Sequence, residues 1–370
     1  MNDRRDDGTG PRLLFGAGGT GGHIFPAMAV ADRCRRLVPG CVIRFVGAKG
    51  RLEEEVVPRH GYELDLLWIS GFDRRISLAN LALPFKVLRS FLQARSIMRR
   101  FRPDCVICAG GFVSWPVGRA ALAAGIPLLL MESNALPGKV VRMLAPRAET
   151  VHVAFEKAVG YLPGATVRIS GNPIRTSFLE PVDRGEAREF FGLDPQKPTL
   201  LAVGGSQGAR SINRALEGMA ETLLADGLQL IWQTGRSYGG QEARREGLYR
   251  ARFIHEMERA YAAADLVIGR AGAMTVSELK VVGRPSILVP LPTAADDHQR
   301  VNAEAMVEAG ASRMIADDRL GDELYGLLTE LLAQPELLRT MGEKGRGMAL
   351  TDADDTIARD LLRTAGVDDI

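Results

Sequence analysis

Two glycine-rich turns, each after an apolar stretch and before a helical one, constrain the fold more than any other feature of this chain. The first is Gly16-Ala17-Gly18-Gly19-Thr20-Gly21-Gly22 and the second is Gly204-Gly205-Ser206-Gln207-Gly208. Glycine lets the backbone turn sharply and approach a ligand, and the helix that follows offers unpaired N–H groups to an anion. We therefore expect two nucleotide-binding folds, one in each half of the chain, facing a central cleft.

Short apolar runs alternate with helical stretches in both halves, which favours doubly wound parallel sheets covered by helices on both faces. With 370 residues, the chain is long enough for two domains. The Gly171-Asn172-Pro173 turn is the natural boundary. We expect an N-terminal domain over residues 1–171, a C-terminal domain over residues 172–350, and a last helix at about 351–366 that packs back on the first domain.

The predicted strands and helices follow from this alternation. In the first half, strands are expected at 12–16, 42–46, 64–69, 105–109, 127–131 and 150–153, with helices at 25–37, 52–59, 84–101, 115–124 and 138–144. In the second half, strands are expected at 199–203, 228–233, 266–268 and 286–289, with helices at 209–224, 275–282, 301–309, 322–333 and 356–364.

Charge and cysteine usage exclude several classes of protein. A formal net charge of +2 is too small for a chain that binds nucleic acid over its whole surface. No apolar run approaches the roughly 20 residues that span a bilayer, and the N-terminus lacks the long apolar region of a signal peptide, so a cytoplasmic location is expected. Cys105 and Cys108 have the spacing of a redox pair but lie within an apolar strand, which favours buried thiols.

The first glycine turn formally matches the fingerprint of dinucleotide-binding enzymes. Such enzymes place an acidic residue at the end of the second strand to hold a ribose, whereas this chain has Phe45-Val46-Gly47-Ala48-Lys49 there. The turn also brings His23 just inside the following helix, where an imidazole could take a proton from a substrate hydroxyl. A dehydrogenase would not need that histidine.

The second half carries the residue types that hold a nucleoside diphosphate. The turn at 204–208 can bind phosphate through backbone N–H groups and the Ser206 hydroxyl. A further glycine turn at 269–272 enters a helix that places Glu278 where a carboxylate could accept hydrogen bonds from two ribose hydroxyls. Arg175, just past the domain boundary, could clamp a diphosphate.

The segment Gly71 to Arg102 combines many cations with apolar side chains. Its basic residues are Arg74, Arg75, Lys86, Arg89, Arg95, Arg99, Arg100 and Arg102, against a single acid, Asp73. Leu78, Leu81, Leu83, Phe85, Val87, Leu88, Phe91 and Leu92 are interleaved with them. This pattern suits an anionic membrane surface, although a helix of this fold must also bury one apolar face against its sheet.

Taken together, these motifs resemble the MurG glycosyltransferases. The resemblance rests on residues 18–23, Gly110-Gly111-Phe112-Val113-Ser114, Glu132 with Asn134, residues 171–175, residues 204–210 with Asn213, Gln233-Thr234-Gly235, residues 270–278, and Asp297-His298-Gln299 with Asn302. Members of that family add N-acetylglucosamine (GlcNAc) from UDP-GlcNAc to the undecaprenyl-pyrophosphoryl-MurNAc-pentapeptide called lipid I. The product is lipid II, a peptidoglycan precursor.

The resemblance implies a GT-B fold in which the C-terminal domain holds most of the donor. The implied donor-binding residues are Thr20, Gly21, Gly22, Asn134, Arg175, Ser206, Ile254, Ala273, Met274, Thr275, Glu278 and Gln299. Among them, the Ile254 backbone would read the uracil edge, Glu278 the ribose, and Gln299 the GlcNAc. The implied acceptor-binding residues are Gly18, Gly19, Gly110 and Gly111. The family's location implies the cytoplasmic face of the plasma membrane, with cell-wall synthesis proteins as possible partners.

In that reaction the MurNAc 4-hydroxyl displaces UDP with inversion, and either His23 or Glu132 could remove its proton. No cofactor and no protein-bound metal are expected, because the single Asp-x-Asp triplet, at 352–354, lies far from any glycine turn. The chain departs from the family pattern at Phe112, Met131 and Ser133, which leaves the acceptor contacts open.

Two other functions remain open at this point. A related GT-B enzyme could use the same donor turns to glycosylate another lipid, such as a diacylglycerol. A scaffold that binds a nucleotide sugar without turnover is a further alternative, although the presence of His23, Glu132, Arg175 and Glu278 together favours an enzyme.

Overall fold

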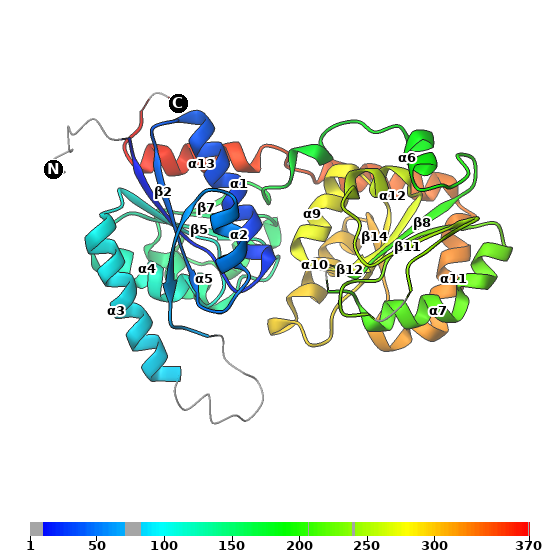
Figure 1. The fold of residues 1–370 in the computed structure, drawn as a ribbon, viewed down its shortest axis with the longest axis horizontal. Coiled ribbons are helices and arrows are strands. Elements are labelled where there is room, and N and C mark those ends of the chain that lie inside the picture. Colours follow the sequence, from blue (N-terminus) through cyan, green and yellow to red (C-terminus); the bar gives the residue numbers. More distant parts are fainter. Residues whose placement is uncertain (1–9, 71–82, 206, 239–240, 369) are drawn as a thin grey trace. The chain divides into compact units, whose positions relative to one another are not determined.

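The computed structural model describes residues 10–70, 83–205, 207–238, 241–368 and 370. The chain divides into two compact units: residues 1–174 with 352–370, called the N-terminal unit, and residues 175–351, called the C-terminal unit. Arg175 therefore begins the C-terminal unit. Figure 1 shows that each unit has a sheet covered by helices on both faces.

The N-terminal unit is built on a seven-stranded parallel sheet in the order β3-β2-β1-β4-β5-β6-β7. Its strands are Arg12–Gly16 (β1), Val42–Ala48 (β2), Glu63–Leu67 (β3), Cys105–Cys108 (β4), Leu128–Glu132 (β5), Thr150–Val153 (β6) and Val167–Ile169 (β7). Its helices are Gly21–Leu37 (α1), Glu53–Arg59 (α2), Leu83–Phe101 (α3), Ser114–Ala123 (α4), Lys139–Leu144 (α5) and Ala353–Thr364 (α13), with 3-10 turns at Ala145–Arg147 and Glu156–Tyr161. The strand order reverses between β1 and β4, and ligands of such sheets bind at the carboxyl ends of the strands at this switch point.

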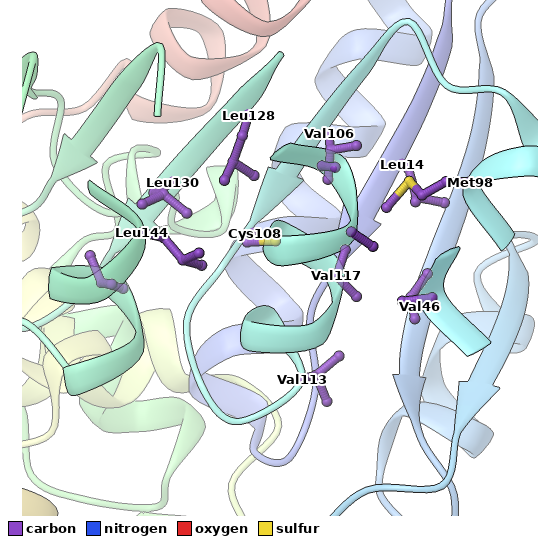
Figure 2. Packing of buried hydrophobic residues seen from close by; sticks show 14 of the residues in the cluster. Leu14, Val46, Met98, Val106, Cys108, Val113, Val117, Leu128, Leu130 and Leu144 are labelled. Atoms are coloured by element: carbon purple, nitrogen blue, oxygen red, sulfur yellow. The ribbon is translucent and has the colours of Figure 1, made fainter. Parts of the chain in front are cut away.

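The side chains of β1 alternate between two apolar cores, one on each face of this sheet. Leu14 packs with Val106, Val117 and Leu130 against α3, α4 and α5, as Figure 2 shows. Leu13 and Phe15 point to the opposite face and pack against α1 and α13. Both faces are therefore buried, which explains why the strands of this sheet are continuous apolar runs.

The two cysteines of β4 lie on opposite faces of the sheet. Cys105 packs in the core beneath α1 and α13, whereas Cys108 packs in the core beneath α3, α4 and α5. Residues three apart on a strand point to opposite sides, so the two thiols cannot approach one another. Burial raises the pKa of the Cys108 thiol to about 12. The expectation that these two thiols are buried is confirmed.

Helix α13 comes from the end of the chain and packs beside α1, as the red and blue helices of Figure 1 show. Ile357 and Leu361 enter the core of this face, and Arg33 on α1 pairs with Asp355. On the adjoining strand β6, the buried His152 Nε2 lies 2.9 Å from Asp360 Oδ2. The last helix is therefore an integral part of the N-terminal unit.

The C-terminal unit repeats the architecture with a seven-stranded sheet in the order β10-β11-β9-β8-β12-β13-β14. Its strands are Thr199–Val203 (β8), Gln229–Gln233 (β9), Ala243–Arg245 (β10), Leu248–Ala251 (β11), Leu266–Arg270 (β12), Ser286–Val289 (β13) and Ser312–Met314 (β14). Its helices are Arg184–Phe190 (α6), Arg210–Ala225 (α7), Met257–Ala263 (α8), Ala273–Val282 (α9), His298–Glu308 (α10), Leu320–Leu332 (α11) and Pro335–Gly347 (α12), with 3-10 turns at Thr176–Phe178, Ala295–Asp297 and Asp317–Arg319. Among the strand pairs of the described residues in this unit, only β10–β11 is antiparallel, and the switch point lies between β8 and β12.

The predicted fold class is confirmed, and the elements differ in detail. Seven were not expected from the sequence: β7, β10, β11, β14, α6, α8 and α12. They are short or lie outside the main alternation of apolar runs. Helix α1 begins at Gly21 rather than at residue 25, because the amides of His23 and Ile24 both bond to the Thr20 carbonyl. Across the described residues, no helix is long and apolar enough to cross a bilayer.

Candidate active site

The first glycine turn lies at the switch point of the N-terminal sheet and is built around a buried carboxylate. Glu53, at the start of α2, accepts hydrogen bonds from the amide of Gly19 at 3.1 Å and from the amide of Ala48 at 2.9 Å. A Cβ at Gly18 or at Gly47 would overlap the Glu53 side chain. Gly18 of this turn and Gly47 of β2 are therefore required by the close approach of Glu53, and a phosphate that used the Gly19 amide would have to displace that carboxylate.

Glu53 also changes the comparison with dinucleotide-binding enzymes. No acid ends the second strand in the sequence, yet α2 brings the Glu53 carboxylate to the end of β2. Glu53 is fully buried, and its oxygens bond to backbone amides of the turn. Its contacts stabilise the turn and are unlike those of an acid that is open to a ribose.

His23 lies between the first glycine turn and the turn that follows β4. Its Nδ1 is 3.2 Å from the Thr20 hydroxyl oxygen. Gly110 and Gly111 have φ of +89° and +74°, and a Cβ on either would come within 3.1–3.2 Å of the His23 ring. The Ser114 hydroxyl fixes the same turn by donating to the Gly110 carbonyl at 2.6 Å. The His23 ring is thus seated on a glycine turn that tolerates no side chain.

Glu132 ends β5 and organises the loop that follows it. One carboxylate oxygen accepts from the amide and the side chain of Asn134 at 2.9 and 3.1 Å, and the other accepts from the amide of Gly138 at 2.8 Å. Burial raises the pKa of Glu132, and these hydrogen bonds oppose the increase. Asn172 pins the same loop by donating to the Ser133 carbonyl at 3.0 Å. Glu132 therefore holds Asn134 in place through its own carboxylate.

The positions that depart from the family pattern lie at different depths. Met131 is buried in the core beneath α1 and α13. Ser133 is also buried, within the loop that Glu132 organises. Phe112 is partly exposed, and its ring packs over the Gly19 backbone, where a Cβ would come within 2.8 Å of the ring. Of the three, Phe112 is thus the partly exposed residue that packs against the first glycine turn.

The second glycine turn follows β8, at the switch point of the C-terminal sheet. Gly205 and Gly208 have φ of +81° and +87°, and the Gly208 amide bonds to the Gly205 carbonyl at 3.1 Å. The Gly208 backbone lies directly against that of Thr234 and Gly235, so Gly208 and Gly235 have no room for a Cβ. Ser206, the predicted phosphate ligand of this turn, lies outside the described residues.

Gln233 joins this phosphate-type turn to the backbone predicted to read uracil. Its side-chain oxygen accepts from the Ile254 amide at 2.9 Å, and its side-chain nitrogen donates to the Gly205 carbonyl at 3.2 Å. Both Gln233 and Ile254 are buried. Asn213 on α7 supports the same region by donating to the Thr234 carbonyl at 2.8 Å. The Gln233 side chain thus links the turn predicted to bind phosphate to the Ile254 backbone predicted to read uracil.

Helix α9 carries the predicted ribose ligand. Its first turn, Ala273 to Thr275, follows Gly272 at the carboxyl end of β12, so its amides are those of a helix N-terminus. Glu278 lies one turn further and accepts a hydrogen bond from the Tyr261 hydroxyl at 3.0 Å. Burial raises the pKa of Glu278 to about 7, whereas the Tyr261 hydrogen bond and the Arg175 charge lower it.

Arg175 is attached to this region through aromatic rings. Its guanidinium lies 4.8 Å from the centroid of the Phe178 ring, and Phe178 contacts Tyr261 edge-on at 5.7 Å. The predicted diphosphate clamp is therefore connected to Glu278 through two rings. Cation–π contacts of this kind hold a guanidinium without using its N–H donors.

Gln299 lies in the first turn of α10, which follows a segment with a strained backbone. Asp296 and Asp297 have φ of +50° and +57°, values that residues with a Cβ rarely adopt. The Gln299 side-chain oxygen accepts from the Leu291 amide at 3.0 Å, so its NH₂ is the group that can donate to a ligand. His298 uses Nδ1 within its own loop, 2.7 Å from the Ala295 carbonyl.

Within the described residues, no group of three or more His, Cys, Asp or Glu side chains is arranged to hold a metal ion. The carboxylates of the Asp-x-Asp triplet have protein partners: Asp352 accepts from the Thr356 hydroxyl and Asp354 pairs with Arg36 at 3.7 Å.

The structure brings the predicted residues into two groups, one in each unit. Thr20, His23, Gly110, Gly111 and Asn134 lie at the carboxyl edge of the N-terminal sheet. Ile254, Ala273 to Thr275, Glu278 and Gln299 lie at the carboxyl edge of the C-terminal sheet. Sequence reasoning missed Glu53 and Tyr261, and it quoted Gln233 without a role. Gln233 stood within a family motif, whereas nothing in the sequence singled out the other two.

Comparisons with known proteins agree with this geometry. A model of the N-terminal domain of glycosyltransferase family 28 matches residues 13–153, and a model of its C-terminal domain matches residues 199–357. Two parallel-sheet units with glycine turns at their switch points, together with these matches, define a glycosyltransferase of the GT-B class.

Individual relatives narrow the class. A protein of Cytophaga hutchinsonii is 40% identical over 360 residues, which cover 96% of this chain and 98% of the relative. A protein of Christiangramia forsetii is 43% identical over 348 residues, which cover 93% and 95%. Both are named UDP-N-acetylglucosamine–N-acetylmuramyl-(pentapeptide) pyrophosphoryl-undecaprenol N-acetylglucosamine transferase. The crystal structure of Acinetobacter baumannii MurG matches with a TM-score of 0.75 at 30% identity, over 96% of this chain and 99% of that one. The chain belongs to the MurG family of glycosyltransferases.

Proposed function

We propose that this chain transfers GlcNAc from UDP-GlcNAc to the MurNAc 4-hydroxyl of lipid I and so forms lipid II. The observation that carries the proposal is the near-complete coverage of relatives that are named for this transfer, at about 40% identity. The donor group in the C-terminal unit supports it, because a helix N-terminus, a carboxylate and a backbone segment beside a phosphate-type turn are what a uridine diphosphate sugar needs.

On the donor side, each contact has a separate task. The Glu278 carboxylate accepts from the two ribose hydroxyls, and the amides at the start of α9 face the diphosphate. Arg175 adds a cation to the same diphosphate. The leaving UDP gains negative charge in the transition state, so the helix N-terminus and Arg175 stabilise the transition state more than the bound donor.

On the acceptor side, we assign the base to His23. His23 Nδ1 lies 3.2 Å from the Thr20 hydroxyl oxygen. In the tautomer whose Nδ1–H donates to that oxygen, the lone pair is on Nε2, and that nitrogen can take the proton of the attacking hydroxyl. Glu132 is less suited, since both of its oxygens already accept hydrogen bonds in its own loop. We assign Glu132 to the orientation of Asn134. Inversion follows because the hydroxyl attacks the face of the anomeric carbon opposite to UDP.

The product of the reaction tests the function. Purified protein is incubated with UDP-GlcNAc and either a soluble lipid I analogue or a diacylglycerol, and the glycosylated product is identified by mass spectrometry. We expect a GlcNAc-MurNAc disaccharide product and UDP release with the lipid I analogue alone. Preference for the diacylglycerol would favour the alternative lipid acceptor, and the absence of UDP release with either would favour a scaffold. Elemental analysis of the same sample is expected to find no stoichiometric metal.

Helix α3 supports a peripheral location on an anionic membrane. Phe85, Leu88 and Leu92, three or four residues apart on one stripe, are 62, 57 and 55% exposed. The opposite stripe, which includes Ala94, Met98 and Phe101, is buried in the core. The helix therefore has an exposed apolar stripe in addition to the one that packs on the sheet.

Cations flank this exposed stripe. Trp68, just after β3, is 39% exposed, and Lys86 and Arg89 lie over its ring at 5.6 and 5.0 Å. A partly exposed tryptophan with cations suits the headgroup layer of a bilayer. The predicted docking segment also includes residues 71–82, which lie outside the described residues. We propose that this surface docks on the cytoplasmic face of the plasma membrane, where lipid I and proteins of cell-wall synthesis, cell shape and division would be met.

Vesicle binding tests the docking surface. Replacing Phe85, Leu88 and Leu92 together by Ser is expected to weaken binding to vesicles with anionic lipid about a hundredfold, because each lost apolar contact contributes roughly 1 kcal/mol when partly inserted. Turnover of a soluble lipid I analogue should be unchanged. Val307→Ser on α10, an exposed apolar residue of the C-terminal unit, is the matched control. Unchanged vesicle binding in the triple variant would contradict the proposal.

A further inference from the structure

Tyr261 has an unusual place beside the donor group. It lies in α8, is fully buried, and its hydroxyl donates to Glu278 Oε2 at 3.0 Å. A buried phenol needs a hydrogen-bond partner, and the partner of Tyr261 is Glu278, which is the proposed ribose ligand.

The hydrogen bond restricts what the Glu278 carboxylate can do. One of its oxygens accepts from Tyr261, so the carboxyl group has a fixed rotation about its last side-chain bond. A ribose diol requires a carboxylate in one orientation to accept from two adjacent hydroxyls. Without Tyr261, Glu278 would have to lose that rotational freedom when the donor binds.

The ring of Tyr261 is itself held in place. Phe178 packs edge-on against it at 5.7 Å with an interplanar angle of 63°, and the 3-10 turn that carries Phe178 contacts α9. The hydroxyl therefore sits on a ring whose position is set by packing, which makes its hydrogen bond directional. This is the arrangement expected for a supporting group that orients a ligand-binding side chain.

We propose that Tyr261 is a positioning residue for the donor ribose, whose hydroxyl holds Glu278 in the orientation that accepts the ribose diol. This inference rests on the proposed function, because it assumes that Glu278 binds the ribose of a uridine nucleotide. It adds a residue that does not touch the donor but decides how strongly the enzyme distinguishes a ribose from a deoxyribose.

The test compares UDP with 2′-deoxy-UDP as ligands of the full-length protein at pH 8, by calorimetry. In the wild type, UDP should bind at least about tenfold more tightly, since a hydrogen bond to a charged group is lost with the 2′-hydroxyl. Tyr261→Phe keeps the ring and removes the hydroxyl. We expect it to weaken UDP about fivefold to tenfold and to leave 2′-deoxy-UDP within about twofold of the wild type, so the preference for ribose nearly disappears.

Two further variants separate positioning from a general effect on the fold. Tyr325→Phe on α11 removes an exposed hydroxyl that bonds to Asp226, and it should leave both affinities unchanged. The double variant Tyr261→Phe/Glu278→Gln should bind UDP no more weakly than Glu278→Gln alone, because Tyr261 acts through Glu278. In turnover assays, Tyr261→Phe should raise KM for UDP-GlcNAc and leave kcat within about twofold.

Each other outcome overturns a defined part of the argument. A wild type that binds UDP and prefers it over the deoxy form, with a Tyr261→Phe variant that keeps the same preference, would refute the inference and leave the proposed function intact. Equal weakening of UDP and 2′-deoxy-UDP by Tyr261→Phe would show a general structural role and would also refute it. A wild type that does not bind UDP would instead refute the proposed function.

Discussion

Donor binding is expected to depend on pH through Glu278. Burial raises the pKa of its carboxyl to about 7, although the Tyr261 hydrogen bond and the Arg175 charge both lower it. Only the ionised carboxylate presents both oxygens as acceptors, because a carboxylic acid uses one oxygen as a donor. Protonation of Glu278 should therefore remove the ribose contact near neutral pH.

The magnitude follows from the ionised fraction of a single group. With a pKa of about 7, binding to the ionised form alone is weakened by a factor of about 1.1 at pH 8, about 2 at pH 7 and about 11 at pH 6. The Kd of UDP-GlcNAc should thus rise about tenfold between pH 8 and pH 6. This weakening is not caused by Glu278 destabilising the fold at low pH. The Glu278 carboxyl has a pKa near 4.5 in the unfolded chain and about 7 in the folded protein, so its contribution to stability is largest at low pH and falls as pH rises from 4.5 towards 7.

Calorimetry with UDP-GlcNAc provides the assay. The sugar nucleotide is preferred to UDP because a terminal phosphate monoester ionises near pH 6, whereas the diphosphate diester of the donor does not. Glu278→Gln is the control: it should bind more weakly than the wild type at pH 8 and show no tenfold change on going to pH 6. A wild-type Kd that stays within twofold between pH 6 and pH 8 would refute the reasoning, as would the full pH dependence in Glu278→Gln.

Three further predictions concern the proposed base and two supporting contacts. His23→Gln should lower kcat by about 10²–10⁴-fold with little change in the donor Kd, whereas Glu132→Gln should lower kcat much less. If turnover assays show the larger loss of kcat in Glu132→Gln, Glu132 is the base instead. Gln233→Leu leaves the Ile254 amide and the Gly205 carbonyl without their side-chain partner, so the free energy of thermal unfolding and the free energy of UDP binding by calorimetry should each fall by about 1–3 kcal/mol. A variant with unchanged stability and unchanged UDP affinity would contradict this link. Glu53→Ala removes the acceptor of the Gly19 and Ala48 amides, so the free energy of unfolding in urea should fall by about 2–4 kcal/mol and KM for the lipid I analogue should rise. A variant of unchanged stability would show that Glu53 does not hold the first glycine turn.

Much of the architecture was predictable from local patterns. Four strands, β1, β6, β8 and β13, begin and end where the apolar runs predict. Both glycine turns lie at switch points because glycines that permit positive φ and helices that follow apolar strands are encoded within a few residues of one another. The short elements β7, β10 and β14 were missed because three residues are too few to show a period.

The sequence by itself determined two doubly wound sheets, their glycine turns and the residue types available for a nucleotide sugar, because backbone conformation and the burial of strand faces depend on neighbours in the chain. Tertiary structure decided which of these groups meet. Glu53 reaches Gly19 across 34 positions, and Tyr261 reaches Glu278 across 17. A hydrogen bond forms only at about 3 Å, and strand order and helix packing set distances of that size, which a one-dimensional pattern does not contain.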